Sequence, residues 1–299
     1  MQYRRLGRTG LDVSVVGVGT WQFGGEWGPA FEQPAADAIL GRARELGINL
    51  VDTAECYGDH LSEELVGRAI RADRDEWVVA TKFGHRFRAP FERDDLWSAR
   101  EVVAQLDASL TALATDRVEL YQFHSGSDEV FDNDELWEAL RAQVQAGKVR
   151  SLGISIANEA GPHQPARARQ VGADAIQLVY NRLQRGPEED VLPICARDDL
   201  GVLARVPLAS GFLSGKYKPG SRFTDADDVR SRAEQEEVQR RLIEVERIAR
   251  EEVPAGVDMA SWALAWCLRE PVVTTVIPGC KSVAQVEANA RAVDLLATA

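Results

Sequence analysis

The sequence contains little cysteine and little histidine, four residues of each among 299. The cysteines are Cys56, Cys195, Cys267 and Cys280, and none of them forms a Cys-x-x-Cys pair. Disulfide frameworks and structural zinc sites depend on closely spaced cysteines or histidines, so this composition argues against both. We expect four free thiols in a reducing compartment and no metal site.

Long hydrophobic runs are also absent. The longest runs, Val13–Trp21 and Val272–Pro278, are far shorter than the roughly 20 apolar residues of a membrane-spanning helix. The first residues, Met1–Arg5, do not lead into the apolar stretch of a signal peptide. The sequence therefore predicts a cytoplasmic protein with no membrane association.

The chain has fewer basic than acidic residues. Lys and Arg number 35 against 47 Asp and Glu, which gives a formal net charge of −12. An acidic chain without a basic stripe is a poor candidate for binding the phosphate backbone of a nucleic acid. A small anionic cofactor stays possible, because a local pocket can be positive on an acidic protein. We therefore expect small-molecule ligands rather than nucleic acid.

Short runs rich in β-branched residues alternate with helical patterns along the chain. Near-continuous Val, Ile and Leu is typical of strands covered on both faces of a parallel sheet. The expected strands are Val13–Gly19, Ile48–Asp52, Trp77–Lys82, Val118–His124, Val149–Ser155, Ala175–Val179, Gly201–Val206 and Val273–Ile277. Helices are expected at Pro34–Leu46, Ser98–Ala114, Asp134–Ala146 and Asn158–Val171. Eight β–α units predict an α/β fold, the (β/α)8 TIM barrel.

Further segments complete the predicted barrel. Tyr3–Arg8 and the turn after it are expected to form an N-terminal β-hairpin with the start of the first strand. An amphipathic helix is expected over Glu234–Glu252, and an extra C-terminal helix over Ser282–Ala297. Residues 207–233 form a long loop of the kind that binds ligands. No repeat or linker divides the chain, so we predict one domain over residues 1–299.

Polar side chains end several of the predicted strands, and in a barrel the strands end at one rim, where active sites lie. Asp52 ends the second strand, and Tyr57 follows it. Lys82 ends the third strand and His124 the fourth. A tyrosine hydroxyl titrates near 10, and a neighbouring lysine ammonium favours the phenolate and lowers that pKa.

These four residue types predict a general acid beside an electrophilic carbonyl. An aspartate would hold the lysine charged, and a histidine can orient a carbonyl oxygen. Since no Ser or Cys nucleophile is evident, hydride from a nicotinamide cofactor fits the remaining step. Each residue also has a structural alternative: Tyr57 as a rim aromatic, Lys82 with Asp52 as an ion pair, and His124 bonded to backbone. Their coincidence at one rim favours the catalytic interpretation.

Segments around these residues, and along nearly the whole chain, match the pattern of one known family. They are Tyr3–Leu11, Gly17–Trp21, Asp52–Gly58 with Ser62 and Glu63, Thr81–Gly84, Leu120–His124, Gly147–Arg150, Pro207–Gly211 and Ile277–Gly279. Through these segments the sequence resembles the aldo-keto reductase superfamily. The resemblance is closest to the branch with bacterial sugar-type reductases and the β-subunits of voltage-gated potassium channels.

The resemblance implies an NADP-dependent oxidoreductase that reduces an aldehyde or ketone with NADPH, or runs in reverse as a sugar dehydrogenase. It implies a catalytic tetrad of Asp52, Tyr57, Lys82 and His124, with Tyr57 as the proton donor. The implied cofactor-binding residues are Gly19, Thr20, Trp21, Asp52, Ser155, Gln177, Arg205, Leu208, Ser210, Gly211, Lys216, Gly279, Lys281, Gln285 and Asn289. Lys281 near a 2′-phosphate would favour NADPH over NADH.

The substrate pocket is harder to derive from the sequence. The expected lining residues are Trp21, Tyr57, His124 and Phe87, with Trp27 and Phe91 as further aromatic candidates at the rim. The segment 84–97 mixes arginines with aromatic residues, which suits a polar or anionic substrate. The simpler interpretation of that segment is a solvated loop with a few packed rings.

Two positions depart from the family pattern. Ser155 is followed by Ile156, where the family usually has an Asn that binds the nicotinamide carboxamide. Arg205 falls near the place of the ring that usually stacks on the nicotinamide, and a guanidinium can stack as well. We therefore expect cofactor affinity or geometry to differ from the family norm.

Two other functions compete with the reductase. One is a regulatory subunit that binds the cofactor with little turnover, as the channel β-subunits do. The other, a phosphate-binding isomerase on the same barrel, lacks distinct glycine-rich phosphate loops in this sequence. The intact tetrad favours the enzyme, acting as a monomer or homo-oligomer on a small carbonyl or sugar substrate.

Overall fold

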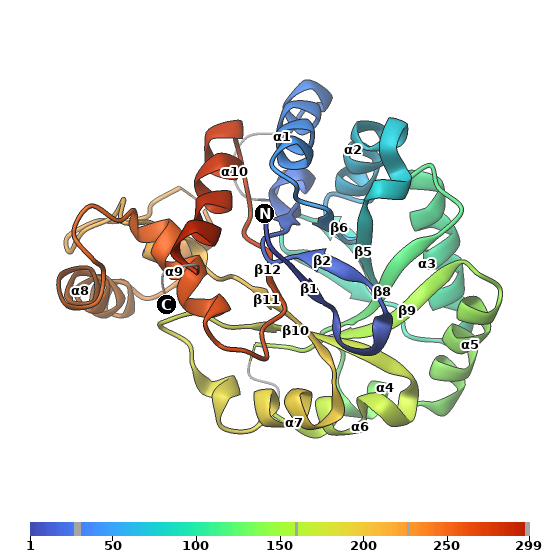
Figure 1. Ribbon diagram of the computed structural model, residues 1–299. Helices are drawn as coiled ribbons and strands as arrows, with labels where there is room; N and C mark the ends of the chain where they lie inside the picture. Colours follow the sequence, from blue (N-terminus) through green and yellow to red (C-terminus); the bar gives the residue numbers. More distant parts are fainter. Residues whose placement is uncertain (27–30, 159–160, 226–227, 297–299) are drawn as a thin grey trace.

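The fold is a barrel of eight parallel strands with helices around it (Figure 1). This computed structural model describes residues 1–26, 31–158, 161–225 and 228–296. Neighbouring strands follow in the order β3, β4, β5, β8, β9, β10, β11 and β12. Isolated parallel bridges from Val16 to Val276 and from Gly19 to Gly279 join the two edges and close the barrel. The predicted fold class is confirmed.

The barrel strands form where the sequence has near-continuous apolar runs. They are β3 (Val18–Gly19), β4 (Leu50–Asp52), β5 (Val78–Phe83), β8 (Val118–His124), β9 (Val149–Ser155), β10 (Ala173–Val179), β11 (Gly201–Arg205) and β12 (Thr275–Val276). All six residues of β5 are buried, as expected for a strand between the barrel interior and the helix layer. The predicted bounds of β8 and β9 match the observed ones.

An N-terminal hairpin closes one end of the barrel. Strands β1 (Tyr3–Arg5) and β2 (Asp12–Ser14) pair antiparallel, as predicted. Leu6, Leu11 and Val13 of this hairpin share a buried cluster with apolar side chains from β4, β5, β8, β10 and β11. Because this end is filled with apolar side chains, a ligand can enter only at the opposite end, where the strands finish.

Helices cover the outside of the barrel. They are α1 (Gln33–Glu45), α2 (Leu61–Ala69), α3 (Ala99–Ala112), α4 (Asp128–Phe131), α5 (Asp134–Gln145), α6 (His163–Val171), α7 (Val191–Asp198), α8 (Gln235–Glu251), α9 (Met259–Leu268) and α10 (Val283–Ala290). Helix α8 lies farthest out (Figure 1). Its apolar face, including Val238 and Leu242, packs on Phe212 and Trp262 rather than on the barrel sheet.

Two sequence predictions of strands and loops were wrong. The expected first strand, Val13–Gly19, is split, because its start pairs with β1 in the hairpin and only Val18–Gly19 joins the barrel. The segment 84–97 is not a simple loop. It forms a second antiparallel hairpin of β6 (His85–Ala89) and β7 (Glu92–Asp95), stabilised by pairing that its charged sequence does not indicate.

Several predicted boundaries also shift. The long loop after β11 contains short 3₁₀ helices at Ala209–Ser214 and Val229–Arg232. The last α-helix ends at Ala290 and tightens into a 3₁₀ helix over Arg291–Leu295. Its predicted end, Ala297, lies outside the described residues, as do positions 159–160 near the start predicted for α6.

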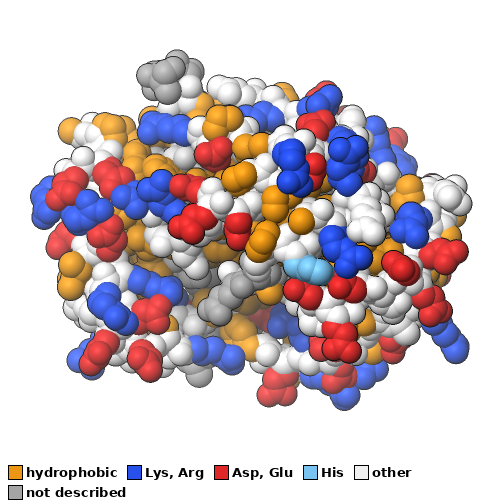
Figure 2. Space-filling view, turned by 90° about the horizontal axis from the view of Figure 1, so that it is seen from below, with side chains coloured by type: hydrophobic (Ala, Val, Ile, Leu, Met, Phe, Trp, Pro, Cys, Tyr) orange, Lys and Arg blue, Asp and Glu red, His pale blue; other side chains and the backbone are white. Residues whose placement is uncertain are grey.

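The surface and the thiols agree with the composition. None of the helices in the described parts of the chain is both long and apolar enough to cross a bilayer. On the face shown in Figure 2, acidic and basic side chains are intermixed rather than gathered into a basic stripe. All four cysteines are buried and free, as predicted.

Candidate active site

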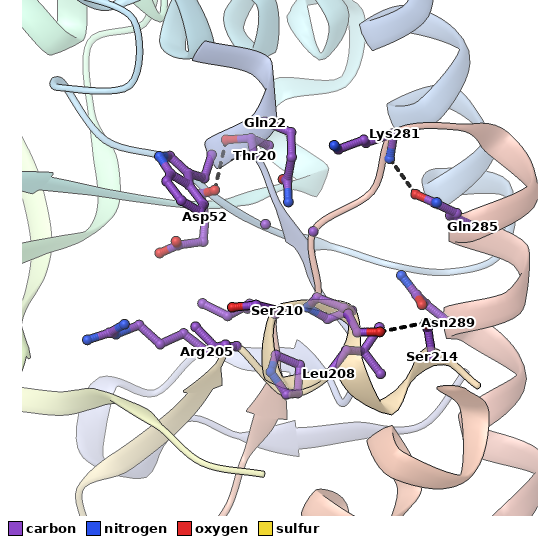
Figure 3. Close-up of a pocket in the computed structure, with 18 of the residues that line it drawn as sticks. Thr20, Gln22, Asp52, Arg205, Leu208, Ser210, Ser214, Lys281, Gln285 and Asn289 are labelled. Atoms are coloured by element: carbon purple, nitrogen blue, oxygen red, sulfur yellow. Dashed lines mark hydrogen bonds between the residues drawn. The ribbon is translucent and has the colours of Figure 1, made fainter. Parts of the chain in front are cut away.

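A large pocket of about 750 Å³ opens where the barrel strands end, opposite the N-terminal hairpin. Asp52 and Arg205 lie at one end of the view in Figure 3, and Lys281 and Asn289 lie at the other. Residues of the loop after β11 line the groove between them. The pocket is therefore elongated and receives side chains from both edges of the closed sheet.

Asp52, the last residue of β4, accepts hydrogen bonds from three polar side chains at the end of the barrel. Its Oδ1 accepts a hydrogen bond of 2.7 Å from Lys82 Nζ. Its Oδ2 accepts bonds from the side-chain amides of Gln177, at 2.7 Å, and Gln122, at 3.1 Å. Both carboxylate oxygens are thus satisfied, which allows a charged group to be buried at the barrel rim.

Lys82, on β5, is fully buried and connects Asp52 to Tyr57. Besides Asp52, its ammonium donates to the Thr53 carbonyl at 2.7 Å and to the Tyr57 hydroxyl at 3.2 Å. Burial opposes the charged ammonium, but Asp52 and then Tyr57 outweigh that effect and raise the pKa of Lys82. Lys82 therefore remains charged directly beside the phenol.

The phenol of Tyr57 titrates above its usual value, which corrects our expectation from the sequence. The Lys82 ammonium does favour the phenolate, as predicted. Burial is the larger influence, however, and the net result raises the pKa of Tyr57 to about 12. The hydroxyl is therefore protonated throughout the neutral range and can act as an acid.

His124, at the end of β8, completes the group. Its ring lies 6.2 Å from the Tyr57 ring, centroid to centroid, at an interplanar angle of 80°. Its Nδ1 lies 3.8 Å from the Cys56 sulfur. Burial, and then the positive charge of Lys82, hold the pKa of His124 well below its ordinary value. The neutral ring can therefore donate one hydrogen bond into the pocket.

A second buried acid lies behind His124. Glu55 accepts a hydrogen bond from the His85 backbone N–H at 3.1 Å, and its Oε2 has no partner among the described residues. Glu55, Cys56 and His124 each offer one ligand-type atom within 4.8 Å of the others. Burial, and then the nearby Glu63, raise the pKa of Glu55 to about 8. While the Glu55 carboxyl is neutral, it adds no buried negative charge to that of Asp52.

This carboxyl should make the stability of the protein depend on pH. Between the usual pKa of 4.5 and the folded value of about 8, the folded chain holds one proton that the unfolded chain has lost. The free energy of unfolding should therefore fall as the pH rises through this window, by a few kcal/mol. Glu55→Gln should remove that fall, as measured by urea unfolding at pH 6 and pH 9.

Glu64→Gln is the matched control, since Glu64 lies on the exposed side of α2 and pairs with Arg68. It should leave the pH dependence of wild type unchanged. An equal fall with pH in wild type and Glu55→Gln would contradict the assignment of the titrating group to Glu55.

Most residues implied as cofactor ligands line this pocket. Those that do are Gly19, Thr20, Trp21, Asp52, Gln177, Arg205, Leu208, Ser210, Gly211, Lys216, Gly279, Lys281, Gln285 and Asn289. Ser155 is not among them, since it lies behind Gln177, with 3.4 Å between Ser155 Oγ and Gln177 Oε1. The structure thus brings together residues from Gly19 to Asn289 that are far apart in the sequence.

Only some of the residues expected to line the substrate pocket do so. Trp21, Tyr57 and His124 line it. Phe87, on β6, is not among the lining residues, and Trp27 lies outside the described residues. Phe91 packs edge-on against Trp21, with 6.2 Å between ring centroids.

Sequence reasoning missed several residues that line the pocket. Gln22, His85, Arg93 and Ser125 surround the tetrad end, and Tyr217 and Arg230 lie along the groove. His85 and Arg93 belong to the segment 84–97, whose arginines and aromatic residues indicated a polar or anionic substrate. The charges of that segment favoured a solvated loop, so neither residue was assigned to the site.

The groove has features that suit a bound polar ligand. A Cβ on Gly279 would lie 2.1 Å from Gln22 Nε2, so a larger residue there would require the Gln22 amide to move. Gln22 Oε1 is buried without a hydrogen-bond partner among the described residues, which suits a sugar hydroxyl. Val206 and Ser210 adopt left-handed φ values of 53° and 55°, and such strained backbone clusters at ligand sites.

The comparison with known proteins now decides the family. A model of the Aldo/keto reductase family matches residues 15–299. The chain belongs to this family. It is therefore an oxidoreductase of the aldo-keto reductase type.

Three proteins to which the chain is similar have different names. An aldo-keto reductase of Bacillus halodurans, solved in its holo form, is 30% identical with a TM-score of 0.82, over 98% of this chain and 91% of that one. The glycerol dehydrogenase of Gluconobacter oxydans is 28% identical with a TM-score of 0.82, over 97% and 89%. A probable voltage-gated potassium channel β-subunit of Arabidopsis thaliana is 31% identical over 99% of this chain and 92% of its own length.

The two departures from the aldo-keto reductase pattern are linked in space. One guanidinium nitrogen of Arg205 donates to the Ile156 carbonyl at 3.0 Å and to Asn158 Oδ1 at 2.8 Å. Asn158 therefore holds Arg205 in place at the pocket wall. Arg205 lines the pocket, and its Nε is buried without a hydrogen-bond partner among the described residues.

Proposed function

We propose that the protein reduces an aldehyde or ketone to the alcohol with NADPH, in a reaction that also runs in reverse on an alcohol or sugar. The whole chain, residues 1–299, acts as one domain. The observation that carries this proposal is the chain of hydrogen bonds from Asp52 through Lys82 to Tyr57, which ends in the pocket. A protonated phenol beside a buried ammonium is suited to deliver a proton to a carbonyl oxygen.

The cofactor would lie along the groove. Lys216, Arg230 and Lys281 place positive charge at one end of it, on a chain whose net charge is −12. Ser210 and Gly211 would hold the pyrophosphate, and Gln177 and Arg205 the nicotinamide end. When bound, NADPH supplies the hydride that no side chain of the pocket can provide.

The protein side chains supply the proton and hold the carbonyl. The substrate oxygen would accept hydrogen bonds from the Tyr57 hydroxyl and the neutral His124 ring, and Tyr57 would give up its proton as the alcohol forms. The Lys82 ammonium, 3.2 Å from the phenolic oxygen, stabilises the phenolate left behind. Asp52 keeps Lys82 charged through this change, and bulk water later returns the proton.

The test is a steady-state assay with a broad panel of aldehydes and ketones. We expect the absorbance of reduced nicotinamide to decline steadily with at least one class of carbonyl compound. Binding of NADPH, followed by protein fluorescence, should precede turnover. Firm NADPH binding without carbonyl-dependent loss of absorbance would overturn the proposal.

The preference for NADPH should depend on Lys281. Its side chain interacts electrostatically with Asp228, Arg230 and Lys216, and Arg230 pairs with Asp228. Lys281 and Lys216 thus leave a net positive charge that suits the extra phosphate of NADPH. Lys281→Gln should weaken NADPH binding about tenfold or more while changing NADH binding little, because a charge-assisted bond is lost. Fluorescence titration with both cofactors measures the difference.

Lys148→Gln serves as the control for Lys281, since Lys148 pairs with Asp107 and does not line the pocket. It should leave both dissociation constants unchanged. Equal weakening of NADPH and NADH binding in Lys281→Gln would show that Lys281 does not bind the 2′-phosphate.

A cofactor-binding regulatory subunit is the second candidate, and the resemblance to the Arabidopsis thaliana channel β-subunit favours it. Such a protein would bind NADPH and show little turnover with any carbonyl compound. The complete Asp52–Lys82–Tyr57 connection supports the enzyme instead, and the same assay separates the two.

A further inference from the structure

The end of the pocket around the tetrad is lined by polar and aromatic side chains. Beside Tyr57 and His124, it is lined by Trp21, His85, Arg93 and Ser125. The aliphatic residues that line the pocket in the described parts of the chain come instead from 206–208 and 260–288. A substrate that approaches Tyr57 therefore meets mainly hydrogen-bonding groups, which favours a polar compound over an alkyl or steroid chain.

Arg93 adds positive charge at this end of the pocket, besides that of Lys82 and Arg205. It lies on β7, in the hairpin that begins directly after the strand carrying Lys82. One terminal nitrogen donates to both oxygens of Glu26, each at 2.7 Å. Glu26 also accepts from Trp21 Nε1, at 2.7 Å, and from the Phe91 backbone N–H, at 3.1 Å. The guanidinium is thus held in a fixed orientation at the pocket wall.

The contact with Glu26 uses only one terminal nitrogen of the Arg93 guanidinium. The side chain of Glu26 is fully buried and is shared among three donors, whereas 23% of the Arg93 side chain is exposed. No second carboxylate pairs with Arg93 within the residues that the structure describes. The guanidinium also contacts the thiol of Cys56, which burial keeps neutral by raising its pKa. The buried Nε–H of Arg93 has no partner among the described residues, so the guanidinium keeps hydrogen-bonding capacity beyond its contact with Glu26.

The position of Arg93 suits a short substrate. Phe91, at the tip of the hairpin, contacts Trp21, and the guanidinium of Arg232 lies 4.0 Å over the Phe91 ring. These contacts connect the hairpin to the start of the barrel and to the long loop. Arg93 itself contacts Cys56, the neighbour of Tyr57, so a compound needs only a short chain to reach both Tyr57 and Arg93.

We propose that the substrate is a short carbonyl compound that carries a carboxylate, which Arg93 binds while the carbonyl faces Tyr57 and His124. The planar guanidinium matches the geometry of a carboxylate, which a lysine would not. This inference rests on the proposed reductase function and adds the class of substrate. Arg93 is the specificity-determining residue, and Glu26 positions it.

The test compares ω-oxo acids of two to five carbons with their methyl esters, which keep the aldehyde and lose the charge. Wild type should favour the best acid over its ester at least tenfold in kcat/KM, as expected for a charge-assisted contact. In Arg93→Gln this acid-to-ester ratio should fall about tenfold or more, toward one. Rising ionic strength should also lower the ratio in wild type but not in the variant.

Arg86→Gln is the matched control, because Arg86 lies on the same hairpin and its exposed side chain pairs with Asp94. It should keep the wild-type ratio. If Arg93→Gln folds poorly because Glu26 is left unpaired, the double variant Glu26→Gln/Arg93→Gln removes both charges and should show the same lost ratio. Unfolding midpoints identify which variant to use.

A second measurement does not depend on turnover. In the presence of NADP⁺, 4-hydroxybutanoate should raise the thermal midpoint of wild type and not that of Arg93→Gln. Equal use of acids and esters by wild type, or an unchanged ratio in Arg93→Gln, would overturn the carboxylate proposal and leave the reductase intact. Absence of turnover with every carbonyl compound would instead overturn the reductase function itself.

Discussion

Tyr57→Phe is expected to lower kcat by about 10²- to 10⁴-fold, the usual contribution of a general acid. The ring and its packing stay, and only the hydroxyl that faces Lys82 is removed. The dissociation constant for NADPH should change little, because Tyr57 is assigned to proton transfer rather than to cofactor binding. Steady-state kinetics and fluorescence titration on the same preparation measure both quantities.

Tyr3→Phe is the control for this experiment. Tyr3 is half exposed on the N-terminal hairpin, and its hydroxyl donates to the Gly47 carbonyl at 2.7 Å, at the closed end of the barrel. Loss of that bond should leave turnover at the wild-type level. A Tyr57→Phe variant that still reduces carbonyl compounds within tenfold of wild type would contradict the assignment of the proton donor.

Lys82→Met should abolish measurable turnover and also destabilise the fold by about 3–5 kcal/mol. Lys82 and Asp52 are both buried, and their ion pair is 2.7 Å long. Removing the ammonium leaves the Asp52 carboxylate with two amide donors and no positive charge. It also leaves the phenolate of Tyr57 without its cation, so proton release becomes less favourable. Urea unfolding and kinetics measure the two losses.

The double variant Asp52→Asn/Lys82→Met separates stability from catalysis. Removing both charges should restore much of the lost stability, because the destabilisation comes from one unpaired buried charge. Activity should stay absent in the double variant. If Lys82→Met were as stable as wild type, or if the double variant regained turnover, the pair would not act as a buried catalytic ion pair.

The barrel could be predicted from the sequence because the signals for its strands and helices are local. Apolar runs, helix stop signals and their order along the chain are readable without contacts, and they placed β8 and β9 at their observed bounds. The residues at the barrel rim could be predicted from the same order of elements, since the parallel strands of a barrel all end at one side. Asp52 and Lys82 could thus be paired in advance, and the structure has them 2.7 Å apart.

What the sequence left undecided depends on burial and on contacts between distant segments. The net shift of the Tyr57 pKa is upward because burial outweighs Lys82, and the degree of burial is a property of the folded chain. The hairpin at 85–95 forms by pairing, and Arg93 lines the pocket while Glu26, 67 residues earlier, pairs with it. Local pattern therefore determined the barrel and its rim, whereas tertiary packing decided the charges that a substrate meets there.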